Sequence, residues 1–150
     1  MMPRRICYSF LFIGLAVAIA SGQEEPVRQV GNPYQEDLPY RIGSDLEPAI
    51  EIEGVRWERV RVATKDGGDP EAGRDHVVVA ELQFDNQQKA GVTLTVVLLL
   101  EDGNGSQLER LPCPEIRLGG KRLKEYRPKF TVPGDDLLAT RNIYLFCRVE

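Results

Sequence analysis

The chain has 150 residues and a formal net charge of −4, from 19 lysines and arginines against 23 aspartates and glutamates. This length suffices for one domain with a substantial hydrophobic core. The acidic balance excludes the nucleic-acid-binding and anionic-membrane-binding classes, because both need a basic surface.

The first predicted element is an export signal. Two arginines precede an apolar run over residues 6–20, and small residues follow it, which is the order of a secretory signal peptide. The run is shorter than the roughly 20 residues of a membrane-spanning helix. We predict a signal peptide over residues 1–22, with cleavage after Gly22 favoured over cleavage after Ala20. The protein is then secreted or periplasmic, without membrane insertion after cleavage; an uncleaved anchor is the alternative.

The second predicted element is a flexible tether over residues 23–47. Acidic residues alternate there with prolines, and no apolar period emerges. Such a composition buries too little surface to offset the entropy of ordering. Only Tyr34 and Tyr40 are candidates for local packing against the domain.

From residue 48 onward the pattern is that of β-structure. Apolar residues alternate with polar ones in six to seven short runs separated by Gly/Pro turns, and no helical period reaches three turns. Two shifts of parity between residues 50 and 62 indicate a bulged or bent strand. The run over 92–100 becomes apolar on both sides, which is typical of a strand in mid-sheet or under another element. We predict an all-β, antiparallel, immunoglobulin-like sandwich over residues 48–150.

Removal of the signal peptide leaves an even pair of cysteines, Cys113 and Cys147, in an oxidising compartment. A disulfide between them would close a loop of about 35 residues and contribute roughly 3–4 kcal/mol. The alternative is two buried free thiols that pack as small apolar residues.

The segment Val77–Val149 follows the motif order of a known family. A valine-rich strand ends at residues 84–86, and the strand within 92–103 ends in a glycine turn. Residues 118–120 then lead into a strand that contains Phe130. In order and spacing, this segment resembles the FxLYD-type immunoglobulin-like domains of secreted and cell-surface prokaryotic proteins.

Leu99 and Leu100 stand where that family carries tyrosine and aspartate, and Gly119 stands where it carries proline. The resemblance implies an immunoglobulin-like fold and supplies no catalytic residue. By analogy, it also implies an accessory or interaction domain.

Catalytic chemistry has little support in the sequence. His76 is the only histidine, so any Ser-His-Asp or Cys-His system would have to use it, and it follows a polar loop where an exposed histidine is ordinary. Zinc and copper sites usually need several His or Cys ligands. We expect no catalytic residue, no cofactor and no metal site. Calcium binding by two acidic loops is left open. One loop contains Asp66, Asp69, Glu71 and Asp75, and the other contains Glu101, Asp102 and Asn104.

Aromatic side chains are the remaining candidates for a contact surface. Trp57 is favoured as a core residue, and the pair Tyr144 and Phe146 is the better surface candidate. The leading hypothesis is a non-catalytic module that contacts an envelope or extracellular protein. The alternative is a carbohydrate-binding module, and a carboxylate hydrolase is a weaker third class. The candidate contact residues are Trp57, Tyr126, Tyr144 and Phe146.

Overall fold

The structure is a computed structural model that describes residues 26–150. The predicted signal peptide and its cleavage site lie outside the described residues. Within residues 26–150, no helix combines the length and the apolar character needed to cross a membrane.

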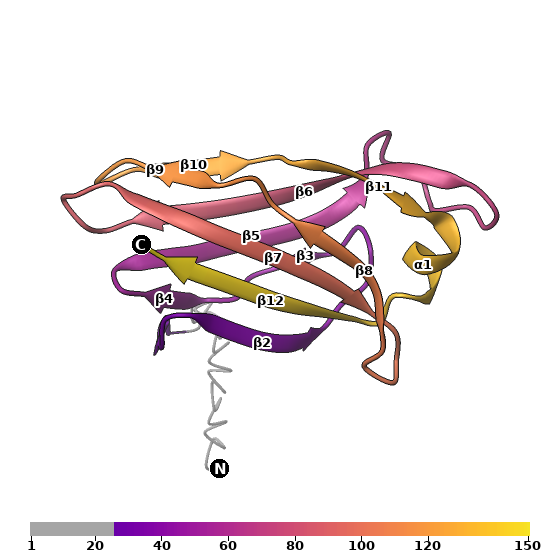
Figure 1. Cartoon of the computed structure of the whole chain (residues 1–150), viewed down its shortest axis with the longest axis horizontal. Coiled ribbons are helices and arrows are strands. Elements are labelled where there is room, and N and C mark those ends of the chain that lie inside the picture. Colours follow the sequence, from indigo (N-terminus) through magenta and orange to yellow (C-terminus); the bar gives the residue numbers. More distant parts are fainter. Residues whose placement is uncertain (1–25) are drawn as a thin grey trace, which may run out of the picture.

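Two β-sheets face each other, and their strands slant in opposite directions in Figure 1. Sheet A has seven strands and sheet B has five. The strands of sheet A are β1 (Arg28–Val30), β3 (Asp45–Leu46), β4 (Ile50–Ile52), β5 (Val55–Thr64), β6 (Asp75–Asn86), β10 (Leu123–Tyr126) and β11 (Lys129–Pro133). The strands of sheet B are β2 (Tyr34–Pro39), β7 (Val92–Glu101), β8 (Gln107–Pro112), β9 (Ile116–Leu118) and β12 (Asn142–Val149). One short helix, α1 (Gly134–Ala139), precedes β12.

The prediction of an all-β sandwich is confirmed. Sheet A runs in the order β1-β4-β5-β6, followed by β10 and β11, and sheet B runs β2-β12-β7, followed by β8 and β9. All pairings are antiparallel except that of β1 with β4. More strands are present than the six to seven expected, because β1, β2 and β3 lie in the predicted tether and two predicted runs divide, one into β4 and β5 and the other into β10 and β11.

The predicted bulge near the start of the domain is present. Glu53 and Gly54 join β4 to β5 with φ angles of 46° and 79°, as a tight hairpin turn requires. The register of β5 against β6 then shifts between Trp57 and Arg59. Two separate features, a turn and a bulge, therefore produce the two shifts of parity in the sequence.

Trp57 lies at the centre of the core and is fully buried. Its ring lies 5.0 Å from that of Phe84, and Tyr34 meets it edge-on at 6.4 Å. Its indole nitrogen donates to the carbonyl of Arg59 at 3.2 Å. The core cluster and both sheets are formed by residues 28–149. The segment 26–150 therefore contains all that an independently folding unit needs.

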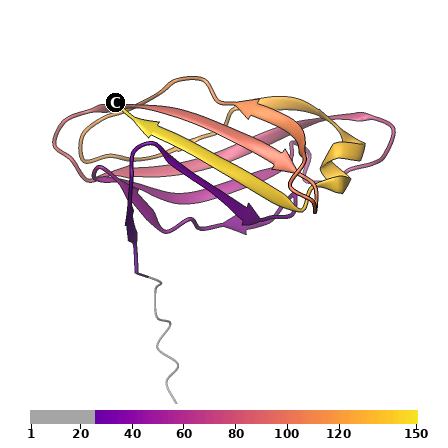
Figure 2. The ribbon, with the colours of Figure 1, turned by 60° about the horizontal axis from the view of Figure 1, so that its bottom comes forward.

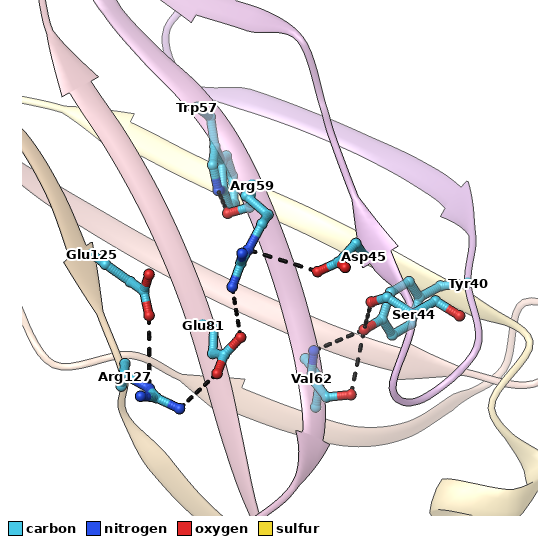
Figure 3. Close-up of polar contacts among 9 residues, drawn as sticks. All are labelled: Tyr40, Ser44, Asp45, Trp57, Arg59, Val62, Glu81, Glu125 and Arg127. Carbon is cyan, nitrogen blue, oxygen red and sulfur yellow. Dashed lines mark hydrogen bonds and ion pairs between the residues drawn. The ribbon is translucent and has the colours of Figure 1, made fainter. Parts of the chain in front are cut away.

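The expectation of a flexible tether over 23–47 is wrong for residues 28–46. β2 pairs with β12 along its whole length, and Tyr34 and Tyr40 are buried. The Tyr40 hydroxyl accepts from the amide of Val62 at 2.7 Å and donates to the carbonyl of Ser44 at 2.8 Å (Figure 3). Pairing to the open edge of β12 satisfies backbone groups, and that gain is invisible in the composition of the segment.

The predicted disulfide is not formed in the structure, where Cys113 and Cys147 are free. Cys147 lies opposite Val96 of β7, and the amide of Cys113 donates to the Val96 carbonyl from the other side at 3.0 Å. Because β7 lies between them, two strand spacings of about 4.8 Å place their Cα atoms about 10 Å apart. A disulfide needs a Cα separation below about 7 Å. The interposed strand therefore prevents the bridge.

Candidate contact surface on sheet B

The outward side of sheet B carries a continuous apolar stripe. Phe146 of β12 lies opposite Val97 of β7, and Tyr144 lies opposite Leu99. Pro112 of β8 continues the first row beyond Val97. We call these five residues the apolar stripe. Pro112 is exposed and the other four are partly exposed.

Strand β7 explains how the stripe arises. Its inward side chains, such as Leu98 and Leu100, are fully buried between the sheets. Its outward positions include Val97 and Leu99, which reach solvent at the middle of the sheet. β2, β12 and β7 lie side by side in one layer in Figure 2, and β8 and β9 pair with the other side of β7. β7 is therefore a mid-sheet strand, as its two-sided apolar pattern predicts.

Charged residues stand at the two edges of this face. The row that contains Tyr144 and Leu99 begins with Asp37 on β2 and ends with Arg110 on β8. Both end residues are exposed. In the described part of the chain, neither side chain forms an ion pair. The face is therefore apolar at its centre, acidic at one edge and basic at the other.

Glu101 lies at the next level of the same face, opposite Asn142. Burial raises the pKa of its carboxyl above the ordinary value, and a hydrogen bond with Asp37 and the charges of Asp37 and Asp102 add to the shift. The Tyr144 hydroxyl donates to the Gln35 side chain of β2. These contacts order the acidic edge of the face.

The outward side of sheet A carries a network of cross-strand ion pairs centred on Glu81, together with the exposed side chains of Val77 and Leu123. Glu81 of β6 accepts from Arg59 at 2.7 Å and from Arg127 at 2.6 Å. Arg59 also lies 3.7 Å from Asp45, and Arg127 lies 3.7 Å from Glu125 (Figure 3). This network joins two arginines to three carboxylates within one chain.

The four predicted contact residues do not form one surface. Trp57 is fully buried, which confirms the favoured assignment to the core, and its inclusion among the contact candidates is wrong. Tyr126 belongs to β10 of sheet A, where its hydroxyl donates to the Arg117 carbonyl at 2.8 Å. Tyr144 and Phe146 alone come together, on the outward side of β12. Sequence reasoning missed the neighbours that complete the surface, although the two-sided apolar pattern of β7 was a usable signal for Val97 and Leu99.

A small hollow of about 160 Å³ lies beside Cys113 and Tyr126, between the loop after β8 and the loop after β10. Burial raises the pKa of the Cys113 thiol to about 12. Because the thiolate is the nucleophilic form, this thiol is poorly suited to covalent chemistry at neutral pH.

The two acidic loops and His76 have structural roles. Asp102 Oδ1 accepts from the amides of Asn104 at 2.8 Å and Ser106 at 2.9 Å, which closes the β7–β8 turn. His76 is buried rather than exposed, and its Nε2 accepts from the amide of Glu71 at 2.9 Å. Across residues 26–150, no group of three or more His, Cys, Asp or Glu side chains is arranged to hold a metal ion.

No protein-family model matches the chain, and no curated protein matches it. Among solved structures, the chain is similar to a "putative beta-galactosidase from Bacteroides fragilis", with 18% identity and a TM-score of 0.33. The match covers 54% of this chain and 10% of that protein. The chain thus spans about a tenth of the length of that protein.

Proposed function

We propose that this chain is a non-catalytic, exported protein-interaction module that contacts its partner through the outward face of sheet B. The observation that carries the proposal is the difference between the two outward faces. Sheet A carries an ion-pair network around Glu81, and its exposed apolar residues Val77 and Leu123 each lie opposite a polar residue. Sheet B instead places aromatic and aliphatic side chains directly opposite one another. The segment over residues 1–22 supports the secreted or periplasmic location.

The residues of the apolar stripe are not part of the hydrophobic core of their own domain. The inward residues of β7 and β12 already fill the space between the sheets, with Leu98 and Leu145 fully buried. Cross-strand pairs on the outward face contribute only about 0.2–1 kcal/mol each. Burial against a partner would recover about 25 cal/mol for each Å² of apolar surface removed from water. A partner therefore accounts for the stripe better than the fold does.

A glycan platform has weaker support, because its three candidate rings are dispersed. Trp57 is buried, and Tyr126 and Tyr144 lie in different sheets. Only Tyr144 and Phe146 remain as neighbouring aromatic side chains, and the residues opposite them are aliphatic.

The test compares the same substitution on the two faces. Val97→Lys places a charge in the apolar stripe, whereas Val77→Lys places it on β6 of sheet A, where Val77 is already 43% exposed. Each variant of the 26–150 chain is immobilised and exposed to a native envelope extract. We expect the amount of captured partner to fall at least tenfold for Val97→Lys and to stay unchanged for Val77→Lys. Equal retention by both variants contradicts the proposal, and binding to a glycan array that Tyr144→Ala abolishes would favour the carbohydrate alternative.

A further inference from the structure

The charges at the edges of the sheet B face indicate what kind of partner fits it. We propose that the partner is a second copy of this chain, bound face to face about a two-fold axis that runs parallel to the strands between β12 and β7. This inference rests on the proposed function, because it uses the same face and names its occupant.

One row of side chains crosses the whole sheet at a single level. It runs Asp37, Tyr144, Leu99, Arg110 over β2, β12, β7 and β8. Rotation about the proposed axis reverses this row and keeps its level along the strands. Asp37 of each copy then faces Arg110 of the other, so a two-fold interface gains two opposite-charge contacts.

The same rotation also matches the apolar residues of the two copies. Rotation brings Tyr144 against Leu99 of the second copy, and Phe146 against Val97 of the second copy. The aromatic side chains of β12 thus meet the aliphatic side chains of β7, and no bulky ring meets its own symmetry mate. One operation therefore matches both the charges and the shapes of the two rows.

A two-fold axis perpendicular to the strands gives no such match. It would exchange the two rows within each strand, so that Asp37 meets Gln35 and Arg110 meets Pro112. Neither contact joins opposite charges. The charge pattern therefore selects the parallel axis.

Asp37 and Arg110 also lack partners of opposite charge within the described chain. The side-chain neighbour of Asp37 is another carboxyl, that of Glu101. On sheet A, by contrast, the carboxylate of Glu81 is paired with both Arg59 and Arg127. The sheet B face therefore keeps two complementary charges available to a second molecule.

The size of the face predicts a weak dimer. Four strands at about 4.8 Å spacing span about 19 Å, and four rows of outward side chains at about 6.8 Å span about 27 Å. Each copy then contributes about 500 Å², and the pair about 1,000 Å², which is at the small end for specific interfaces. We expect a dissociation constant in the micromolar range or weaker.

The experiment uses charge reversal and sedimentation equilibrium on the 26–150 chain. Asp37→Arg alone and Arg110→Asp alone each bring like charges together twice, so each should weaken self-association at least tenfold. In an equimolar mixture, one copy carries two arginines and the other two aspartates at these positions. The mixed dimer should therefore form with about the strength of the unaltered protein. Arg74→Asp, in an exposed loop, is the control and should leave self-association unchanged.

A monomer at every concentration overturns the inference, as does self-association that survives both reversals or a mixture that fails to associate. These results are separable from failure of the proposed function. A monomeric protein that still captures an envelope partner, and loses it in Val97→Lys, has the proposed surface but a different occupant. If Val97→Lys loses neither self-association nor partner capture, the sheet B face is not the contact surface.

Discussion

Replacement of Tyr34 by alanine tests whether the N-terminal segment is a strand of the sandwich or a tether. Tyr34 is 5% exposed and lies edge-on to Trp57, with ring centroids 6.4 Å apart. Truncation to alanine removes that contact and leaves a cavity beside the largest core side chain. Aromatic-to-alanine changes in cores cost about 3–5 kcal/mol, and we expect a loss in that range. A tether residue would cost almost nothing.

The assay is urea unfolding followed by the fluorescence of Trp57, the single tryptophan of the chain. Tyr34→Phe keeps the ring and loses only the hydrogen bond to Glu36, so it should cost about 1 kcal/mol. Arg41→Ala, at an exposed position just after β2, should stay within about 0.5 kcal/mol of the parent. A loss below about 1 kcal/mol for Tyr34→Ala would refute the docking of β2 and restore the tether interpretation.

Two further predictions concern ionisable groups. The pKa of Glu101 is raised in the folded state, so the folded protein holds a proton more tightly there than the unfolded chain does. Its contribution to stability is present at low pH and is lost as pH rises from the unfolded value of about 4.5 through the raised folded value. We expect Glu101→Gln to raise the urea midpoint at pH 7 and to converge with the parent below about pH 4; equal midpoints at both values would contradict this. Burial raises the pKa of Cys113 and Cys147 to about 12, so both thiols should resist alkylation in the folded protein and react after denaturation without a reductant. Failure of either cysteine to label after denaturation would indicate a bridge.

The sequence was sufficient to predict the sandwich because its signals are local. Alternation within β6 and β7 sets the inward face of each strand, and Val78, Leu82 and Leu98 on those faces are all fully buried. The bulge in β5 was also visible, since a single inserted residue inverts the parity of every side chain that follows.

The cysteine pair shows where local signals fail. Position 113 follows β8 and position 147 belongs to β12, and each cysteine packs against the core from its own side of β7. Compartment and cysteine count favour a bridge, but strand order decides whether it can form. Strand order depends on pairing between distant segments, and no pattern within either segment encodes it.

The same dependence on pairing explains why the centre of the contact surface could be predicted and its rim could not. Tyr144 and Phe146 share a parity within one strand, so sequence alone brings them together. Asp37 reaches the same face only because β2 pairs with β12, about a hundred residues further along the chain. The segment first interpreted as a tether therefore supplies the acidic edge of the sheet B face.

If β2 is undocked, Asp37 no longer stands opposite Tyr144, and the charge pattern that selects a two-fold axis disappears. The stability of Tyr34 variants and the self-association of Asp37 variants are therefore two separate tests of the pairing of β2 with β12. A variant that releases β2 should weaken the dimer even though Tyr34 lies on the opposite side of the strand from the interface.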